Sequence, residues 1–583
     1  MATDVLPQAQ SDREVTQRVD AERARLRTQL AARSTVVHFR RPAERPFTAA
    51  ERERVTILFG GLTAKHESLI KAVFQAAGYR SEILPQADVA ACQLGKEYGN
   101  NGQCNPTYFT VGQLIKYLRD LEASGLSRQA IIDGYVFFTA GACGPCRFGM
   151  YEAEFRLALQ NAGFDGFRVL LFQQTDGLRA ASGEPGLKFT VDFGMGAYRA
   201  LNLGDVLNDL TYQLRPFEVN AGRTDRVMRE VMEILTRAVR EQRRYEIDGH
   251  APRWLLARLH GRKSLRDTLN TLGKIHDHLY GRHACDALAE AEDRIAAIAV
   301  DRLRVKPVVK VTGEFWAQTT EGDGNFQMFS FLEREGAQVM VEPISTWVMY
   351  MLWLAKANRI RRKDVDYPPL PWTNPKGRLT RELKFHTRVA YLELGQWFWS
   401  RQYRRTAGLL GGLAHPLVSL DDLAALAAPY YNVFARGGEG HMEVAKNIYY
   451  TITRKAHMVL SLKPFGCMPS SQSDGVQAAV MNRFKDMIFL PIETSGEGEI
   501  NAHSRVQMAL GEAKAKARAE FDQALSSTGR RLDQLRGFVD AHPVLRHPFY
   551  RVPHRPGITG TAARFVLHVA DLMDRRVRFS RMS

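Results

Sequence analysis

A short apolar run that two glycines close, followed by a helical pattern, is the sequence feature that most restricts the fold. Residues 55–59 read Val-Thr-Ile-Leu-Phe, Gly60 and Gly61 follow, and a helical pattern extends over 67–77. An unbroken apolar run is typical of a strand that is buried on both faces, and such strands belong to parallel sheets covered by helices. The folded part of the chain is therefore predicted to begin with an α/β unit.

The same order of elements recurs in two stretches of the chain. Apolar runs predict strands at 81–84, 134–139 and 167–172, and again at 308–311, 338–341, 457–462 and 487–490. Helical patterns lie between them, at 110–123, 143–161, 326–335, 345–357 and 475–484. This alternation favours doubly wound sheets, whose sites lie at the carboxyl ends of the strands. We predict an α/β protein with two Rossmann-like doubly wound lobes, helical insertions and helical termini.

The length of 583 residues is too great for a single hydrophobic core. The strand patterns cluster in two stretches, which charged helical sequence separates and flanks. The expected segments are a charged helical arm and linker (1–48), a first α/β lobe (49–205), a helical bridge (206–305), a second α/β lobe with a helical insertion (306–515) and a basic helical C-terminal tail (516–583).

Hydropathy and charge exclude some classes of protein. No segment reaches the roughly 18 apolar residues of a membrane span, and the N-terminus lacks the apolar core of a signal peptide. We therefore expect a cytoplasmic protein with no membrane partner. The formal net charge of +17 would suit an anionic cofactor or nucleic acid. Nucleic acid is disfavoured, because no helix-turn-helix, zinc-finger or RNA-binding signature accompanies the charge.

Three of the six cysteines lie in turns rich in glycine and proline. They are Cys104 in Gly-Gln-Cys-Asn-Pro, Cys146 in Cys-Gly-Pro-Cys-Arg-Phe-Gly and Cys467 in Pro-Phe-Gly-Cys-Met-Pro. Such turns hold sulfur at a loop tip, and a nearby helix N-terminus favours the thiolate, which is the form that binds metal. The pattern predicts an iron–sulfur or zinc site. Cys92 and Cys285 carry no motif and are expected to be structural.

Two other interpretations of these cysteines stay open. Cys143 and Cys146 form a Cys-Gly-Pro-Cys string, which is typical of a thiol–disulfide oxidoreductase, although the tryptophan that usually precedes it is missing. Zinc usually takes four nitrogen or sulfur ligands. His66 and His441 would have to complete such a site, and each is more simply a helix-start or surface histidine.

Several strings in the chain resemble the 2-hydroxyacyl-CoA dehydratase superfamily, and specifically its activase-related branch. The most specific are Gly-Pro-Cys146-Arg-Phe-Gly and Pro-Phe-Gly-Cys467-Met-Pro. Cys104-Asn-Pro, Lys-Val-Thr-Gly-Glu314-Phe-Trp and Glu-Gly-Glu499-Ile-Asn are similar as well. The resemblance covers roughly residues 50–515.

The resemblance implies a 4Fe-4S cluster between Rossmann-like lobes, with Cys104, Cys146 and Cys467 as its ligands. Cys143 would be a fourth ligand, a resolving thiol or a small filler. In the family, a partner ATPase of the actin-like fold injects a low-potential electron, which makes a ketyl radical of an acyl-CoA so that water can leave. This chain carries no phosphate loop of that kind. The activase would therefore be a separate protein, and a CoA ester the candidate substrate.

Two glutamates are candidate catalytic residues. Glu314 and Glu439 are expected in strand-end loops that face one crevice, where either would serve as an acid or base. The simpler interpretation is a carboxylate that stabilises a helix N-terminus. The expected function is that of an iron–sulfur protein that accepts low-potential electrons, either as a dehydratase-like lyase or as an electron-transfer component. A thiol–disulfide oxidoreductase and a non-catalytic cluster scaffold are the alternatives, and a homo- or hetero-oligomer is left open.

Overall fold

A computed structural model gives the structure of the chain. It describes residues 8–32, 44–141, 146–173, 186–242, 245–250, 252, 254, 263–435 and 438–582. The chain divides into two units, Met1–Ala43 and Glu44–Ser583. The first unit contains the helix α1 (Gln8–Ala32), whose side chains from residue 14 to residue 28 are exposed. The charged helix predicted for this segment is confirmed.

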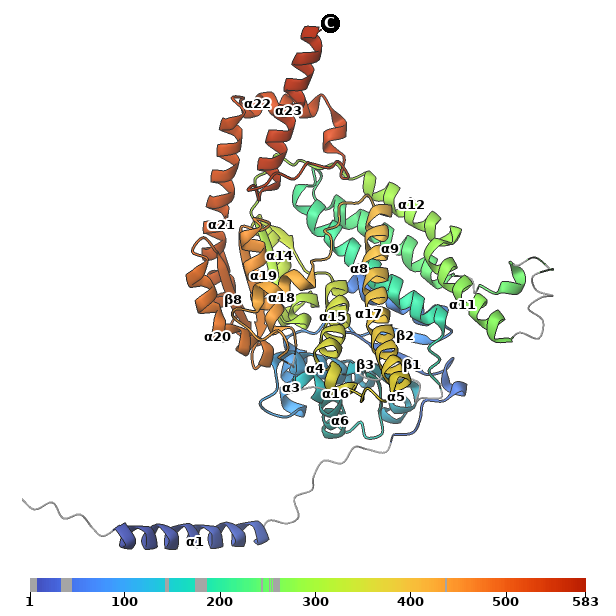
Figure 1. Ribbon diagram of the computed structural model, residues 1–583, viewed down its shortest axis with the longest axis vertical. Coiled ribbons are helices and arrows are strands. Elements are labelled where there is room, and N and C mark those ends of the chain that lie inside the picture. Colours follow the sequence, from blue (N-terminus) through green and yellow to red (C-terminus); the bar gives the residue numbers. More distant parts are fainter. Residues whose placement is uncertain are drawn as a thin grey trace, which may run out of the picture. The chain divides into compact units, whose positions relative to one another are not determined.

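The second unit begins with a four-stranded parallel sheet (Figure 1). Its strands are β1 (Thr56–Phe59), β2 (Arg80–Ile83), β3 (Tyr135–Gly141) and β4 (Arg168–Gln173), and their order is β2-β1-β3-β4. All four residues of β1 are buried, as the apolar run predicted. Because the order of the strands reverses between β1 and β3, the carboxyl ends of these two strands are where a sheet of this kind usually forms its crevice.

A second parallel sheet has the same strand order. Its strands are β5 (Val308–Gly313), β6 (Gln338–Met340), β7 (Met458–Pro464) and β8 (Phe489–Thr494), and their order is β6-β5-β7-β8. Every residue of the inner strands β5 and β7 is buried. The predicted α/β class is thus confirmed, with two parallel sheets.

Helices surround the first sheet and continue into a helical region. Those of the first lobe are α2 (Ala64–Ala76), α3 (Val89–Tyr98), α4 (Asn105–Ala123), α5 (Arg128–Gly134) and α6 (Tyr151–Asn161). The helical region contains α8 (Val191–Leu214), α9 (Arg223–Arg240), α11 (Lys263–Tyr280) and α12 (Arg282–Ala296). One hydrophobic core joins α2 to α8, α9 and α12. The helix α8 also runs without interruption across position 205, where the first lobe was expected to end.

The second lobe contains most of the remaining helices. These are α13 (Phe315–Thr319), α14 (Met328–Arg334), α15 (Ile344–Arg361), α16 (Lys363–Asp366), α17 (Pro375–Leu409), α18 (Leu420–Ala427), α19 (Gly440–Ile452), α20 (Met468–Arg483) and α21 (Glu499–Ser527). The chain ends with α22 (Leu532–Asp540) and α23 (Thr561–Met582). These two helices pack on Phe521 of α21 and on Leu303, so α21 continues across position 515 into the C-terminal segment.

Short 3₁₀ helices connect several elements. They are η1 (Ala49–Glu51), η2 (Arg147–Met150), η3 (Arg215–Phe217), η4 (Ile247–Gly249), η5 (Asp323–Asn325) and η6 (Pro543–Arg546). Among the residues that the structure describes, no helix combines the length and the apolar composition that a membrane crossing requires.

Three sequence predictions were inaccurate in detail. The helix predicted at 475–484 begins at Met468, because Pro469 fits the first turn of a helix, where its missing N–H is not needed. The strand predicted at 487–490 runs from Phe489 to Thr494; it contains Pro491, which an edge strand such as β8 tolerates. The helix α3 was not predicted.

Candidate functional site

Each of the three turn-borne cysteines that the sequence singled out is the N-cap residue of a helix. Cys104 precedes α4, Cys146 precedes η2 and then α6, and Cys467 precedes α20. The three residues share an extended backbone, with φ values of −74°, −66° and −70°. A helix N-terminus has unpaired N–H groups and a partial positive charge, both of which favour an anion such as a thiolate.

Two of the cysteines occupy equivalent places in the two lobes. Cys146 follows β3 and Cys467 follows β7, and these are the third strands of two sheets with the same order. This equivalence was predicted from the sequence. Residues 142–145 lie outside the described residues, so the structure gives no position for Cys143.

Cys104 differs from the prediction in its neighbours. It was expected in a loop at the carboxyl end of a strand, but it follows the helix α3. The carboxylate of Glu154, on α6, fixes this turn: it accepts hydrogen bonds from the side chains of Asn100 and Gln103, at 2.8 and 2.9 Å. The backbone N–H of Gln103 donates to the hydroxyl of Tyr108 at 3.0 Å. A polar network thus replaces the expected strand end.

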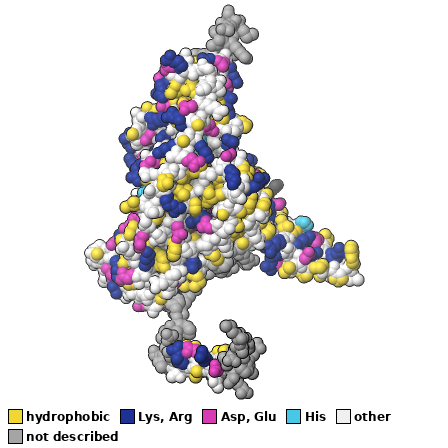
Figure 2. All heavy atoms as spheres, turned by 90° about the vertical axis from the view of Figure 1, so that its left-hand side faces the viewer, with side chains coloured by type: hydrophobic (Ala, Val, Ile, Leu, Met, Phe, Trp, Pro, Cys, Tyr) yellow, Lys and Arg dark blue, Asp and Glu magenta, His cyan; other side chains and the backbone are white. Residues whose placement is uncertain are grey.

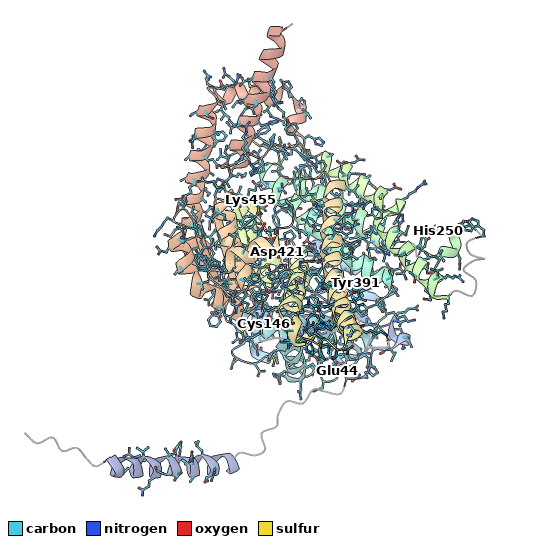
Figure 3. The ribbon with its side chains drawn as sticks, in the orientation of Figure 1. Glu44, Cys146, His250, Tyr391, Asp421 and Lys455 are labelled. Carbon is cyan, nitrogen blue, oxygen red and sulfur yellow. The ribbon has the colours of Figure 1, made fainter. Side chains whose placement is uncertain are left out.

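The turns that carry the three cysteines adjoin one another. The backbone N–H of Asn105, next to Cys104, donates to the carbonyl of Phe465 at 3.0 Å. The guanidinium of Arg147, next to Cys146, donates to the carbonyl of Gly466. A Cβ atom built on Gly466 would stand 3.4 Å from the Cα of Cys104. Two lobes therefore contribute to one site, on which Cys146 is labelled in Figure 3.

Burial governs the ionisation of the three thiols. It raises the pKa of Cys104 and of Cys467, and it raises the pKa of Cys146 to about 11. The charge of the Glu314 carboxylate acts in the same direction on all three. The sulfur of Cys104 also lies 3.2 Å from the hydroxyl of Tyr151. Without an added cation these thiols are neutral near pH 7, and a bound metal would supply the charge that makes them thiolates.

Glu314 and Glu439 lie at the same site. Glu314 follows β5 and caps α13, where its carboxylate accepts a hydrogen bond from Ala317 N–H at 2.9 Å. Burial and the neighbouring Glu439 raise the pKa of Glu314 to about 8. Burial and Glu443 raise the pKa of Glu439 to about 7. Glu439 was expected in a loop that follows a strand. It instead immediately precedes α19, because the helical insertion ends there.

Sequence reasoning missed the group that ties α19 to α20. The carboxylate of Glu443 accepts hydrogen bonds from the hydroxyls of Ser470 and Ser473, at 2.9 and 2.6 Å. The ammonium of Lys463 lies 3.7 Å from the same carboxylate. The contact fixes the first turn of α20, which begins at Cys467. Residues 440–448 of α19 are all buried, so helical periodicity gives no sign of the partners of Glu443.

Two adjoining pockets reach the site from the bridge side. Each has a volume of about 20 Å³, enough for little more than a water molecule, and the two share Gln318 and Glu342 in their linings. Glu439 and Lys446 line the second pocket. Burial opposes the ionisation of Glu342, but Lys310 at 2.8 Å and Lys446 at 3.6 Å outweigh it and lower the pKa to about 2. The pocket beside Glu439 thus holds fixed charges of both signs.

The two histidines considered for zinc have other partners. His66 lies 2.7 Å from the Thr63 hydroxyl and 3.3 Å from the Asp205 carboxylate. His441 contacts the rings of Tyr350 and Trp353, and burial lowers its pKa to about 4. Within the described ranges, no three or more His, Cys, Asp and Glu side chains are grouped so as to hold a single metal ion.

Comparison with known proteins does not identify the function of this site. No family model matches the sequence, and a search of curated proteins finds no match. The surface likewise gives no simple class: Figure 2 shows lysine and arginine side chains interspersed with acidic and apolar ones on the face it presents. The geometry of the three cysteine turns is therefore the basis for a functional hypothesis.

Proposed function

We propose that this chain is an iron–sulfur protein similar to the activase-related branch of the 2-hydroxyacyl-CoA dehydratase superfamily. Cys104, Cys146 and Cys467 would hold a 4Fe-4S cluster. A separate ATPase of the actin-like fold would deliver low-potential electrons, and a CoA ester would be their final acceptor. The observation that carries the proposal is the meeting of three cysteine-capped helix N-termini from two lobes.

The donor set fits such a cluster. Soft thiolates are the ligands of iron–sulfur centres, and backbone N–H groups near the sulfurs tune the reduction potential. Each cysteine that holds a 4Fe-4S cluster binds a different iron, so the cysteine sulfurs lie farther apart than the ligands of a single metal ion. A single-ion group, which the described residues lack, is therefore not required for such a cluster. With three cysteine ligands, one iron of the cluster is left for a non-protein ligand. A cluster of this kind, when bound, would supply one-electron transfer.

The other residues of the site have roles that follow from their positions. The turns at Cys104 and Gly466 help to bury Cys104 and Cys467, whereas Cys146 is half-buried. Glu314 and Glu439 would hold and move a proton beside the centre, since Glu314 is half-buried, Glu439 is buried and Glu439 also lines a pocket. Lys446 would place a fixed positive charge beside the same pocket, which holds little more than a water molecule.

The principal alternative is a thiol–disulfide oxidoreductase that uses Cys143 and Cys146. Its nucleophile would need a lowered pKa, because the thiolate is the attacking form. Burial instead raises the pKa of Cys146 to about 11. This favours a metal-ligating role for Cys146 over a free nucleophilic one.

Iron and sulfide analysis of the full chain, purified without oxygen, tests the proposal. We expect a brown protein with about four iron and four sulfide per chain. Cys467→Ala should lose both, because it removes one of three protein ligands. Cys285→Ala is the matched control, since Cys285 lies on α12 away from the three turns, and it should keep both. Colourless wild-type protein without iron would refute the proposal.

A second measurement tests whether the electrons come from a separate ATPase, and the cysteine variants test the oxidoreductase alternative. In the cluster-loaded protein, bleaching of the visible absorption should require both ATP and an added activase. The oxidoreductase alternative makes the opposite prediction for the variants: disulfide reduction would persist in Cys467→Ala and would vanish in Cys146→Ala.

A further inference from the structure

The insertion of the second lobe contains a helical hairpin in which most residues are exposed. We call residues 356–405 the hairpin arm; it comprises the second half of α15, then α16, and most of α17. Between residues 354 and 401, Phe385 is the only buried residue. The arm exposes nine large apolar side chains: Ile360, Val365, Leu370, Trp372, Leu379, Leu383, Tyr391, Leu394 and Trp397. Monomeric proteins rarely expose so much apolar surface in one region without using it for binding.

Contacts within the hairpin arm hold its two helices together. α15 and α17 lie side by side, and α16 joins them (Figure 1). The ring of Tyr367 packs edge-on against Phe385 at 5.8 Å between centroids, and the hydroxyl of Tyr367 accepts a hydrogen bond from Arg388 at 2.6 Å. The ammonium of Lys363 lies 4.7 Å above Phe385. The exposed side chains thus stand on a defined support.

Internal ion pairs use every acidic residue of the hairpin arm. The pairs are Asp364–Arg381 at 3.1 Å, Asp366–Arg362 at 3.2 Å, Glu382–Lys363 at 2.8 Å and Glu393–Lys356 at 3.8 Å. The arm contains thirteen lysines and arginines against these four acids, which is a net charge of +9 out of +17 for the chain. Lys376, Arg378 and Lys384 form no ion pair with any residue that the structure describes. The excess charge of the arm is therefore available to a ligand.

The turn before α17 presents an aromatic side chain at the end of this charged surface. Trp372 is 84% exposed and follows the sequence Pro-Pro-Leu370-Pro, whose prolines restrict the backbone. The guanidinium of Arg378 lies 3.8 Å above its ring. The side chain of Asn374 caps α17 by accepting a hydrogen bond from Gly377 N–H at 2.9 Å. A tryptophan, a leucine and a cation thus share one end of the arm.

We propose that the hairpin arm binds an anionic phospholipid surface. Trp372 and Leu370 enter the interfacial region, while Lys376, Arg378 and Lys384 contact the headgroups. Tryptophan favours the membrane–water interface, and clustered lysines and arginines are attracted to anionic lipids. The expectation of no membrane partner rested on the lack of a spanning segment, and binding at the surface needs none.

Charge and composition favour lipid over two other occupants. A second copy that docked arm to arm would bring two surfaces of net charge +9 together. Nucleic acid would match the charge, but it offers no apolar partner to the exposed leucines Leu379, Leu383 and Leu394. A lipid surface satisfies both the cations and the apolar side chains.

Vesicle flotation of the full chain tests this inference independently of iron content. We expect binding to vesicles of phosphatidylcholine mixed with phosphatidylserine, weak binding to phosphatidylcholine alone, and loss of binding at high salt. Trp372→Ala should weaken partitioning onto the vesicles about tenfold or more. Lys376→Ala and Lys384→Ala should each weaken it about fivefold. Met508→Ala, at a 78% exposed position of α21, is the matched control and should change nothing.

Other results would overturn the inference. Equal binding to both kinds of vesicle, no binding, or binding that Trp372→Ala leaves intact would each do so. So would a dimer in light scattering that Trp372→Ala dissociates, or a tight complex with single-stranded DNA that the lysine variants lose, because the arm would then serve a second copy or a nucleic acid. The unfolding midpoint of Trp372→Ala should equal that of the wild type, which excludes misfolding as the cause.

Discussion

At Gly466 the backbone adopts a conformation that few residues other than glycine take. Its φ is +73°, and a Cβ atom there would stand 3.2 Å from the carbonyl oxygen of Gln103. We expect Gly466→Ala to lower the free energy of unfolding by about 1–2 kcal/mol, because an L side chain is strained in this region. It should also reduce iron content, since the turn carries Cys467. Urea unfolding and iron analysis measure the two effects.

Gly475→Ala is the control for that substitution. Gly475 lies within α20, and no neighbouring atom stands within 4 Å of a Cβ placed there. Alanine at this position should stabilise the protein by about 0.5–1 kcal/mol. Equal effects at Gly466 and Gly475 would contradict the role given to the turn.

Glu67 gives a prediction of pH dependence away from the cysteines. Burial raises its pKa from 4.5 to about 8. The folded state therefore binds a proton more tightly than the unfolded state, and the stabilisation is complete below pH 4.5 and is lost as the pH rises toward 8. The contribution of this group falls by about 1.4 kcal/mol per pH unit. In urea unfolding across this range, Glu67→Gln should remove that slope, and parallel curves would contradict the assignment.

The sequence allowed some of these residues to be predicted and not others. The turns at Cys146 and Cys467 were predictable, because glycine and proline beside an apolar run indicate a strand that ends in a turn. The prediction that a strand precedes Cys104 was wrong. The helix α3 precedes it, and its ten residues give no long periodic pattern. The contact of Glu443 with Ser470 and Ser473 joins residues 27 and 30 positions apart, and no local pattern shows such a pairing.

Among the elements, α3 and α4 cross at unusually short range. A Cβ atom at Gly112 would overlap the carbonyl oxygen of Ala91, and one at Gly95 would overlap that of Tyr108. The first residue before α4 is Cys104, so the crossing also fixes one sulfur. Gly112→Ala should separate the two helices and cost about 3 kcal/mol of stability. Thermal unfolding measures the loss. Gly511→Ala, in an open position of α21, should not lower the midpoint.

The elements themselves were largely predictable, whereas the packing of the helical insertion was not. The predicted strands are present because buried parallel strands read as unbroken apolar runs, which few other elements share. α17 has 35 residues and two apolar faces, one packed and one exposed. Periodicity indicates such a helix but does not show which face the protein covers.

For the molecule as a whole, a ligand held by both lobes should couple their stabilities. Loading with iron and sulfide should raise the midpoint of thermal unfolding, because the ligand binds the folded state alone. Cys467→Ala should show no such rise, since it removes the ligand from the second lobe. A loaded wild type that unfolds at the same temperature as the iron-free protein would argue against a site shared between lobes.

The approach of the lobes could not be derived from the sequence. Equivalent strand ends suggested that Cys146 and Cys467 face one crevice, but contacts such as Asn105 with Phe465 and Arg147 with Gly466 join positions more than 300 residues apart. Only tertiary packing sets such distances.

The shared strand order of the two sheets also bears on descent. Two copies of one ancestral half-chain, fused end to end, would leave this arrangement: third strands that each lead into a cysteine-capped helix, at Cys146 and Cys467. An ancestor of that kind would have been a symmetric pair with two equal thiols. Cys467 is the one cysteine in residues 306–515, so Cys104 has no cysteine counterpart in the second lobe. On such a descent, Cys104 would have been gained by one half, or lost by the other, after fusion.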